Sequence, residues 1–149
     1  MKAQIAVLCD KATVREGLLH ILGGGVSLLG RPQLPAKLDV DLALLLQPET
    51  VEELNGTHQV SLSLATEGGE QLMRGVIGFE VGTPDEIPDP LPGLPLAVPL
   101  RDIPLKSYGV HVLSALVDDK PVVEIRFRVD KTLVTGVTES LSPDQAIDQ

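Results

Sequence analysis

The side chains best suited to chemistry in this 149-residue chain are three histidines and one cysteine. His20, His58 and His111 fall on three different expected strands, so a fold could gather them around one metal ion. However, no H-x-H or H-E-x-x-H spacing is present, and a cupin-like metal site normally shows paired histidines on one strand. We therefore expect three unrelated histidines, no metal site and no cofactor.

The lone cysteine, Cys9, is followed directly by Asp10 at the end of an apolar run. A neighbouring carboxylate raises the pKa of a thiol, which disfavours the reactive thiolate. We therefore expect a buried, structural cysteine. A single cysteine also excludes an internal disulfide framework, and together with the absence of a signal-peptide pattern it makes a cytoplasmic location the default.

Other stretches resemble binding motifs in composition only. Gly23 to Gly25 is not followed by the Lys-Ser/Thr pair of a phosphate loop, so we interpret it as a turn. No Gly-x-Ser-x-Gly elbow is present. Carboxylates at Asp85, Glu86 and Asp89 suggest a calcium loop, but the prolines among them restrict wrapping around an ion. With no catalytic motif, we expect a protein that is not an enzyme.

The composition argues against two classes of partner. The formal net charge is −9, so a phosphate backbone or an anionic membrane surface would be repelled. Only 2% of residues are aromatic, which also weakens binding of single-stranded nucleic acid, because bases stack on aromatic rings. We expect neither nucleic acid nor membrane as a partner. No apolar run approaches the length of a membrane-spanning helix.

The clearest structural signal is a predicted β-hairpin over residues 108–129. Its second strand alternates apolar and charged residues, which places the charged ones on a solvent-facing side of a sheet. This stripe is our candidate interaction face, with an ordinary solvated face as the alternative: Glu124, Arg126 and Arg128. The first strand, 110–117, is apolar almost throughout, which predicts cover on both faces. Between them, 118–121 is a polar turn.

The remaining chain predicts short strands separated by turns and loops. Residues 10–17 are expected to form a helical turn or a polar loop, and Gly23 to Gly25 a hairpin turn into 26–29. The Pro-rich stretch 83–104 predicts a crossover with an edge strand over 94–100. The other expected strands are 3–9, 18–22, 39–47, 58–65 and 71–81.

This pattern predicts an all-β fold. We expect an antiparallel β-sandwich of the immunoglobulin-like or C2-like kind with seven to nine strands, or alternatively a small β-barrel. One domain is expected over residues 1–130. Residues 131–149 lack strong periodicity and predict a polar, mobile tail.

Two stretches of the chain resemble a family of small bacterial proteins, mainly actinobacterial, that has no assigned activity. The first is AQIAVLCDKATVREGLLHILGGG, followed by a proline near Pro32 or Pro35, and the second is GVHVLSALVDDKPVVEIRFRV. The resemblance covers most of the chain up to about Val129. It implies a cytoplasmic β-sandwich, and it transfers no functional residue.

Three functions are compatible with these observations. The first is a non-enzymatic interaction or accessory module that acts on an unknown protein partner or as a homo-oligomer. The second is a small-ligand-binding sandwich, with a ligand between the sheets or at the loops around Gly23 to Gly25 and the prolines. The third is a metal-dependent enzyme, which would require at least two of the three histidines to converge in one pocket.

Overall fold

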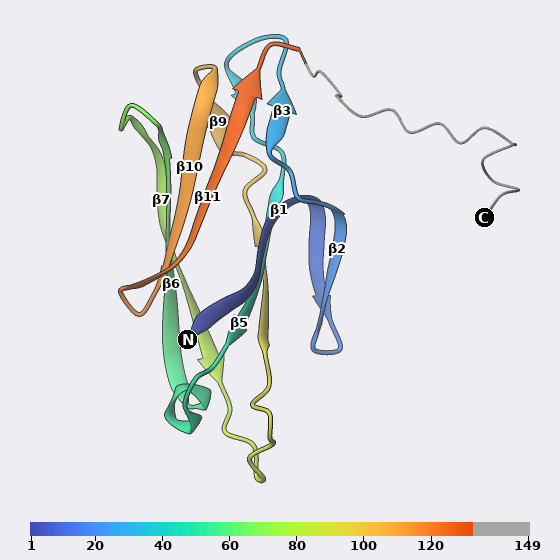
Figure 1. The fold of residues 1–149 in the computed structure, drawn as a ribbon, viewed down its shortest axis with the longest axis vertical. Coiled ribbons are helices and arrows are strands. Elements are labelled where there is room, and N and C mark those ends of the chain that lie inside the picture. Colours follow the sequence, from blue (N-terminus) through green and yellow to red (C-terminus); the bar gives the residue numbers. More distant parts are fainter. Residues whose placement is uncertain (133–149) are drawn as a thin grey trace, which may run out of the picture.

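The structure is a computed structural model, and it describes residues 1–132 as strands curled into facing sheets (Figure 1). One sheet runs in the order β2 (Leu18–Gly24), β1 (Lys2–Arg15), β5 (Asp41–Gln47) and β8 (Leu94–Pro99). The other runs in the order β3 (Leu28–Gly30), β11 (Lys120–Asp130), β10 (Gly109–Val117), β6 (Gly56–Thr66) and β7 (Gln71–Val81). A small ladder joins β4 (Ala36–Lys37) to β9 (Pro104–Leu105), and a 3₁₀ turn spans Val51–Leu54.

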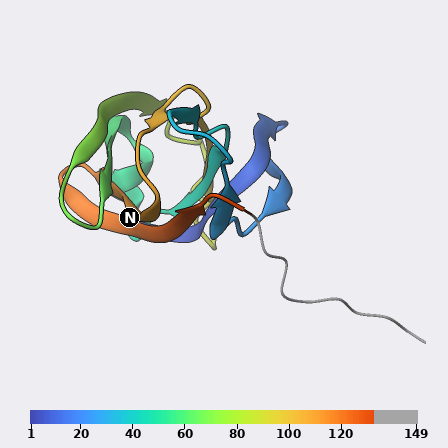
Figure 2. The same cartoon turned by 90° about the horizontal axis from the view of Figure 1, so that it is seen from above.

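The predicted all-β fold is confirmed as a sandwich whose sheets curl toward a barrel (Figure 2). Eight described strands have six or more residues, which agrees with the predicted seven to nine, and three further strands have only two or three. One pairing departs from the antiparallel prediction, because β3 runs parallel to β11. The reason is that the chain leaves β2 and crosses directly to the other sheet, where Leu28 lies opposite Arg128.

Branched aliphatic side chains fill the space between the two sheets, as the low aromatic content requires. The central strand β5 buries Leu42, Leu44 and Leu46 completely, and β6 contributes Val60, Leu62 and Leu64. These side chains belong to one cluster of nineteen buried residues that spans both sheets. At roughly 1.5–3 kcal/mol for each buried side chain, this core is the main source of stability. It also occupies the space in which a ligand between the sheets would lie.

The predicted β10–β11 hairpin is confirmed, including its turn, where Asp118 and Asp119 both adopt positive φ. One detail of the prediction was wrong. Strand β10 is not covered on both faces, because buried residues alternate with half-exposed ones along its length. Its outer face is apolar but open, since no element in the described chain packs over that side of the five-stranded sheet.

Residues 10–24 form the main departure from expectation. Strand β1 does not end at Asp10 but continues to Arg15, and it pairs with β2 through a tight turn at Glu16 and Gly17. Both turn residues have positive φ (54° and 74°), as the two-residue turn of a hairpin requires. The predicted loop over 10–17 and the predicted hairpin turn at Gly23 to Gly25 were therefore wrong. We call residues 10–24 the arm.

The arm lies against the outer face of the four-stranded sheet, outside the curled sandwich (Figures 1 and 2). Strand β1 pairs with β5 up to Cys9 and with β2 from Cys9 onward, so the chain changes neighbours at this residue. A second, smaller apolar cluster forms beneath the arm from Cys9, Ala12 and Ala43, with Val7, Leu19, Ile21 and Ala97 packed around them. The two sheets thus differ, because one outer face is covered and the other is open.

Candidate functional site

The structure places the three histidines at three separate sites. His20 is exposed on the arm, whereas His58 and His111 are buried in the five-stranded sheet. His111 lies opposite Thr66 in the β6–β10 ladder, eight residues along β6 from His58. At about 3.3 Å per residue this puts the two imidazoles near opposite ends of the sheet. Among residues 1–132, no group of three or more histidine, cysteine or acidic side chains is arranged to hold a metal ion, and Asp85, Glu86 and Asp89 are exposed in a loop.

His58 forms a polar contact that links β6 to the turn between β10 and β11. Its Nδ1 lies 2.5 Å from Oδ2 of Asp118, and Oδ1 of the same carboxylate accepts the backbone N–H of Gln59. Burial of Asp118 raises its pKa, but the bond from His58 and the bond from Gln59 outweigh this, so the pKa of Asp118 lies below its ordinary value. The ring of His58 stacks on Phe79, with its Nε2 buried and unpartnered. We interpret this pair as structural.

Cys9 is fully buried beneath the arm, as predicted for a structural cysteine. Its thiol donates a weak bond to the carbonyl oxygen of Asp41 at 3.5 Å. Burial raises the pKa of the thiol, and the carboxylate of Asp41 raises it further. A thiol in this environment stays protonated and inaccessible, which disfavours a role as a nucleophile.

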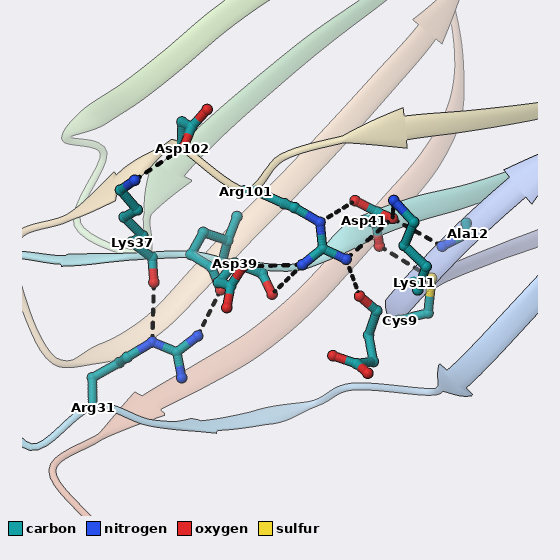
Figure 3. A network of polar contacts seen from close by, with 11 residues as sticks. Cys9, Lys11, Ala12, Arg31, Lys37, Asp39, Asp41, Arg101 and Asp102 are labelled. Atoms are coloured by element: carbon teal, nitrogen blue, oxygen red, sulfur yellow. Dashed lines mark hydrogen bonds and ion pairs between the residues drawn. The ribbon is translucent and has the colours of Figure 1, made fainter.

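The arm is fastened to the sheet by a buried carboxylate, Asp41, at the start of β5 (Figure 3). Asp41 is only 2% exposed, and its Oδ2 accepts the backbone N–H of Ala12 from the arm at 2.8 Å. Nε of Arg101 lies 3.3 Å from Oδ1. This contact lies outside hydrogen-bond geometry, so it is an ion pair without a hydrogen bond. Nζ of Lys11 lies 4.0 Å from Oδ2. We call Asp41, Arg101, Lys11 and the Ala12 N–H the clamp.

Arg101 extends the clamp in two further directions. Its guanidinium donates to Oδ1 of Asp39 at 3.0 Å and to the backbone carbonyl of Asp10, where the arm begins. The bond to Asp39 and the nearby charge of Asp41 raise the pKa of Arg101, so it remains a cation. Arg101 therefore joins the loop after β8, the start of β5 and the base of the arm. The clamp has a structural consequence: it fixes the direction of the arm.

The outward face of the arm combines exposed leucines with basic side chains. Leu18 and Leu22 are 63% and 69% exposed, the highest values among the large apolar side chains of the described chain. The ladder places Arg15 opposite Leu18 and Lys11 opposite Leu22, with His20 between the two leucines. A hollow of about 300 Å³ on this face is lined by Lys11, Thr13, Arg15, His20, Ile21 and Leu22, with no carboxylate. The arrangement is that of an apolar contact surface with a cationic rim.

The predicted stripe on β11 lies where the alternation placed it. Glu124, Arg126 and Arg128 are all exposed on the outer face of the five-stranded sheet. Two of the three charges already have partners on the same chain, because Arg126 contacts Glu67 at 2.7 Å and Arg128 lies 3.6 Å from Asp130. The stripe is therefore exposed, but its cations are partly neutralised.

Comparison with models of protein families gives a match over most of the chain. A model of a family of unknown function, DUF6941, matches residues 4–130. The chain belongs to this family. The match begins in β1 and ends with β11, so the matched segment of this chain contains the arm, the clamp and both sheets. No curated protein matches the chain. Over the described residues, no helix is long and apolar enough to cross a membrane.

Sequence reasoning missed both the arm and the clamp. The arm had one local signal, because Glu16-Gly17 separates two short runs in which apolar side chains recur, but this turn pair is weaker than Asn-Gly or Asp-Gly. The clamp had none. Asp41 and Arg101 are sixty residues apart, and nothing in either local sequence distinguishes them from solvated charges.

Proposed function

We propose that this member of the family is a non-enzymatic protein-interaction module whose main contact surface is the outward face of the arm. One observation carries the proposal: the two most exposed large apolar side chains of the described residues, Leu18 and Leu22, lie on the same face of one strand of the arm, four residues apart with His20 between them. Exposed leucines are individually ordinary on protein surfaces, but two on one face, flanked by cations, form a patch with defined chemistry.

The chemistry of this face specifies the kind of partner. Lys11 and Arg15 flank the leucines in a chain whose net charge is −9, so the hollow on this face of the arm has a cationic lining on an acidic protein. Such a patch fits a protein surface that has an apolar depression bordered by carboxylates, because opposite charges orient the encounter and the leucines supply the buried area. The clamp supports this use, since an arm already held in place loses little conformational freedom on binding.

The stripe of Glu124, Arg126 and Arg128 remains a second candidate contact surface. It lies on the open face of the five-stranded sheet, and its position supports docking of a partner on that side. We rank it below the arm because its arginines are paired within the chain, and a partner would first have to displace Glu67 and Asp130. Charge reversal at Arg126 tests this surface separately from the arm.

The experiment compares matched surface variants in capture from native lysate and then in binding to the purified partner. Leu18→Ser with Leu22→Ser removes the leucines of the arm, and Ile87→Ser serves as control because Ile87 is also exposed (52%) but lies in a distant loop. We expect the arm variant to weaken binding by about a hundredfold, from about 1.4 kcal/mol lost at each leucine, and the control to bind like wild type.

Capture of a protein does not by itself support the proposal, because its binding must also depend on the arm. If the captured protein binds the Leu18→Ser, Leu22→Ser variant and wild type equally, the arm is not the contact surface. Arg15→Glu adds an independent measurement, because Arg15 lies on the rim but outside the clamp, and reversal of its charge should slow association and weaken the salt dependence of association. A partner lost only with Arg126→Glu would assign the function to the stripe instead.

A small-ligand function is the second candidate, and one observation favours it. A depression of about 440 Å³ lies between β7 and the segment after β8, lined by Leu72, Met73, Leu100, Ile103 and the charged side chains Arg101 and Asp102. This differs from the ligand position between the sheets, which the core fills. A thermal-shift screen over metabolites tests it, because a ligand that binds only the folded protein raises Tm.

The proposal includes a bacterial origin and a cytoplasmic location. The supporting observation is that the single cysteine is a free, buried thiol, which is compatible with a reducing compartment. Detection of the protein in the cytosolic fraction of its native cell tests the location.

A further inference from the structure

Within residues 1–132, strand β7 has an edge that pairs with no other strand. It is the last strand of the five-stranded sheet, is eleven residues long, and among these residues is hydrogen-bonded only to β6. An edge of this length exposes a row of backbone N–H and C=O groups that can pair with another strand. Natural proteins usually block such an edge with proline, clustered charge or a bulge. Strand β7 contains no proline and only two charged residues, Arg74 and Glu80, and its one register irregularity lies at its start, between Gln71 and Met73.

The other sheet edges of the described chain are blocked or short. Strand β8 has prolines at 95 and 99, which remove backbone donors from its edge. Strand β3 has three residues, and β2 has seven and ends in two glycines. The contrast makes β7 the edge of the described fold with the greatest capacity for a further strand.

One face of β7 is directed toward the core, but the side chains on that face are only partly buried. None of its eleven residues is buried, although its neighbour β6 buries every second side chain. Three apolar residues on its inner side, Met73, Ile77 and Phe79, pack against the core yet remain half-exposed. On its outer side, Val76 is 62% exposed. A strand added beside β7 would cover these side chains.

The backbone direction fixes which residues of β7 can pair outward. The backbone carbonyl of Gln59 in β6 accepts the N–H of Asp118 on the β10 side, whereas the backbone N–H of Thr66 donates to the carbonyl of Glu70 on the β7 side. The backbone groups of odd-numbered residues in β6 therefore point toward β10, and those of even-numbered residues point toward β7. Val60 and Ile77 consequently form a hydrogen-bonded pair. The outward backbone groups of β7 consequently belong to the alternate residues Arg74, Val76, Gly78 and Glu80.

These outward residues are complementary to the same residues of a second copy when the two β7 strands run antiparallel with Ile77 at the centre. In an antiparallel pair centred there, Arg74 lies opposite Glu80 of a second copy and Val76 opposite Gly78, twice each by symmetry. All four pairs occupy hydrogen-bonding positions. On the inner face Phe79 lies opposite Gly75, a combination in which the aromatic ring covers the glycine of the neighbouring strand. Charge, size and hydrogen-bond direction thus agree on one register.

We propose that the partner of this edge is a second copy of the chain, joined β7 to β7 in antiparallel register with the two-fold axis at Ile77. The two five-stranded sheets then become one continuous sheet of ten strands. This inference extends the proposed interaction function by naming one partner, but it uses a different surface. Loss of the arm leucines should leave dimerisation intact, so failure of one proposal is distinguishable from failure of the other.

The first test is a disulfide placed on the predicted axis. In this register the two Ile77 residues form a non-hydrogen-bonded pair with a Cα separation of about 4.5 Å, within the range of a disulfide. Ile77→Cys should give a covalent dimer on mild oxidation. Val76→Cys is the control, since its two copies lie diagonally, about 7–8 Å apart, and should not cross-link. The native Cys9 is fully buried and should not react.

The second test measures mass against concentration by light scattering or sedimentation. Wild type should be a dimer of twice the 15.9 kDa protomer mass. Arg74→Glu or Glu80→Arg alone should raise the dimer Kd about tenfold by creating two like-charge pairs, and the double swap should restore it. Gly78→Pro should yield monomer, because it removes an outward N–H, and a Cβ at Gly78 has room in the protomer, 4.0 Å from the nearest atom.

Three results would overturn the proposal. Wild type could remain monomeric at every concentration. The dimer could persist unchanged in Gly78→Pro, with unaltered circular dichroism as evidence that the variant folds. Val76→Cys could cross-link while Ile77→Cys does not, which would exclude the register. Arg128→Glu provides the matched control for the charge swaps, since it lies on the same sheet face but at the opposite end from β7.

Discussion

Replacement of Asp41 by alanine should release the arm from the sandwich. The carboxylate is buried and accepts the N–H of Ala12, which is itself 6% exposed, so its loss leaves a buried donor without an acceptor. It also leaves Arg101 without the carboxylate that its Nε contacts. The arm then keeps its apolar contacts through Ala12, Leu19 and Ile21 and the bond from Arg101 to the carbonyl of Asp10 at its base.

The magnitude follows from these two losses. An unsatisfied buried backbone donor costs roughly 1–3 kcal/mol. Arg101 is 31% exposed and can regain water, so the loss of its ion pair adds little to this cost. Asp41→Ala should therefore lower the free energy of unfolding by about 1–3 kcal/mol, mainly through the unsatisfied N–H of Ala12. Asp41→Asn retains an acceptor for Ala12 and should cost about half as much.

The native cysteine reports the release directly. Cys9 is fully buried beneath the arm and the clamp, so its reaction with a thiol reagent requires the arm to open. Asp41→Ala should react much faster than wild type at a denaturant concentration that leaves the sheets folded, and hydrogen exchange at the Ala12 amide should accelerate in parallel. If urea unfolding shows the expected loss while Cys9 and Ala12 stay protected, the clamp supports the whole sandwich and does not hold the arm specifically.

Two further predictions concern stability. Asp118→Asn should lower the free energy of unfolding by about 1 kcal/mol at pH 7, because it removes a charged but half-exposed partner of His58. Since the folded pKa of Asp118 is lowered, this contribution is present above its ordinary value of 3.8 and is lost as pH falls through the folded value, so urea midpoints of variant and wild type should converge as the pH is lowered below 3.8. Gly23→Ala should cost about 2–3 kcal/mol, because Gly23 has positive φ and a Cβ would lie 2.9 Å from Cβ of Asp10. Gly17→Ala, with similar φ but open space, should cost about 1 kcal/mol in the same thermal or urea unfolding measurement, and equal losses would contradict the predicted clash.

Strands with one buried face were predictable from the sequence because their period of two is a local property. Strand β6 shows this well: Val60, Leu62 and Leu64 alternate with serines in the sequence and are buried in the structure. The same argument placed the stripe of β11 on the solvent side. The argument failed for β10, because an apolar strand with one open face gives the same sequence pattern as a strand covered on both faces.

The arm and clamp were not predictable because they depend on contacts between distant segments. Residues 10–15 are mostly polar and read as a loop, yet β2 and the Asp41 carboxylate together hold them in an extended strand. Burial of Asp41 could not be inferred either, since an aspartate at the start of a strand is normally solvated and becomes tolerable here only through Ala12 and Arg101. Long-range pairing thus outweighed local propensity in both cases.

The positions of the arm and of β7 connect the two proposals. They lie on opposite flanks of the sandwich in both views, so two copies joined through β7 would carry their arms at the far ends of the assembly (Figures 1 and 2). Such a dimer is bivalent toward any partner that the arm binds. Where that partner is clustered, the second contact becomes intramolecular, and avidity can exceed the single-site affinity by a factor on the order of 10²–10⁴. Monomeric Gly78→Pro would then bind a clustered partner far more weakly than wild type but a single partner in solution equally well, which only separate surfaces for dimerisation and binding explain.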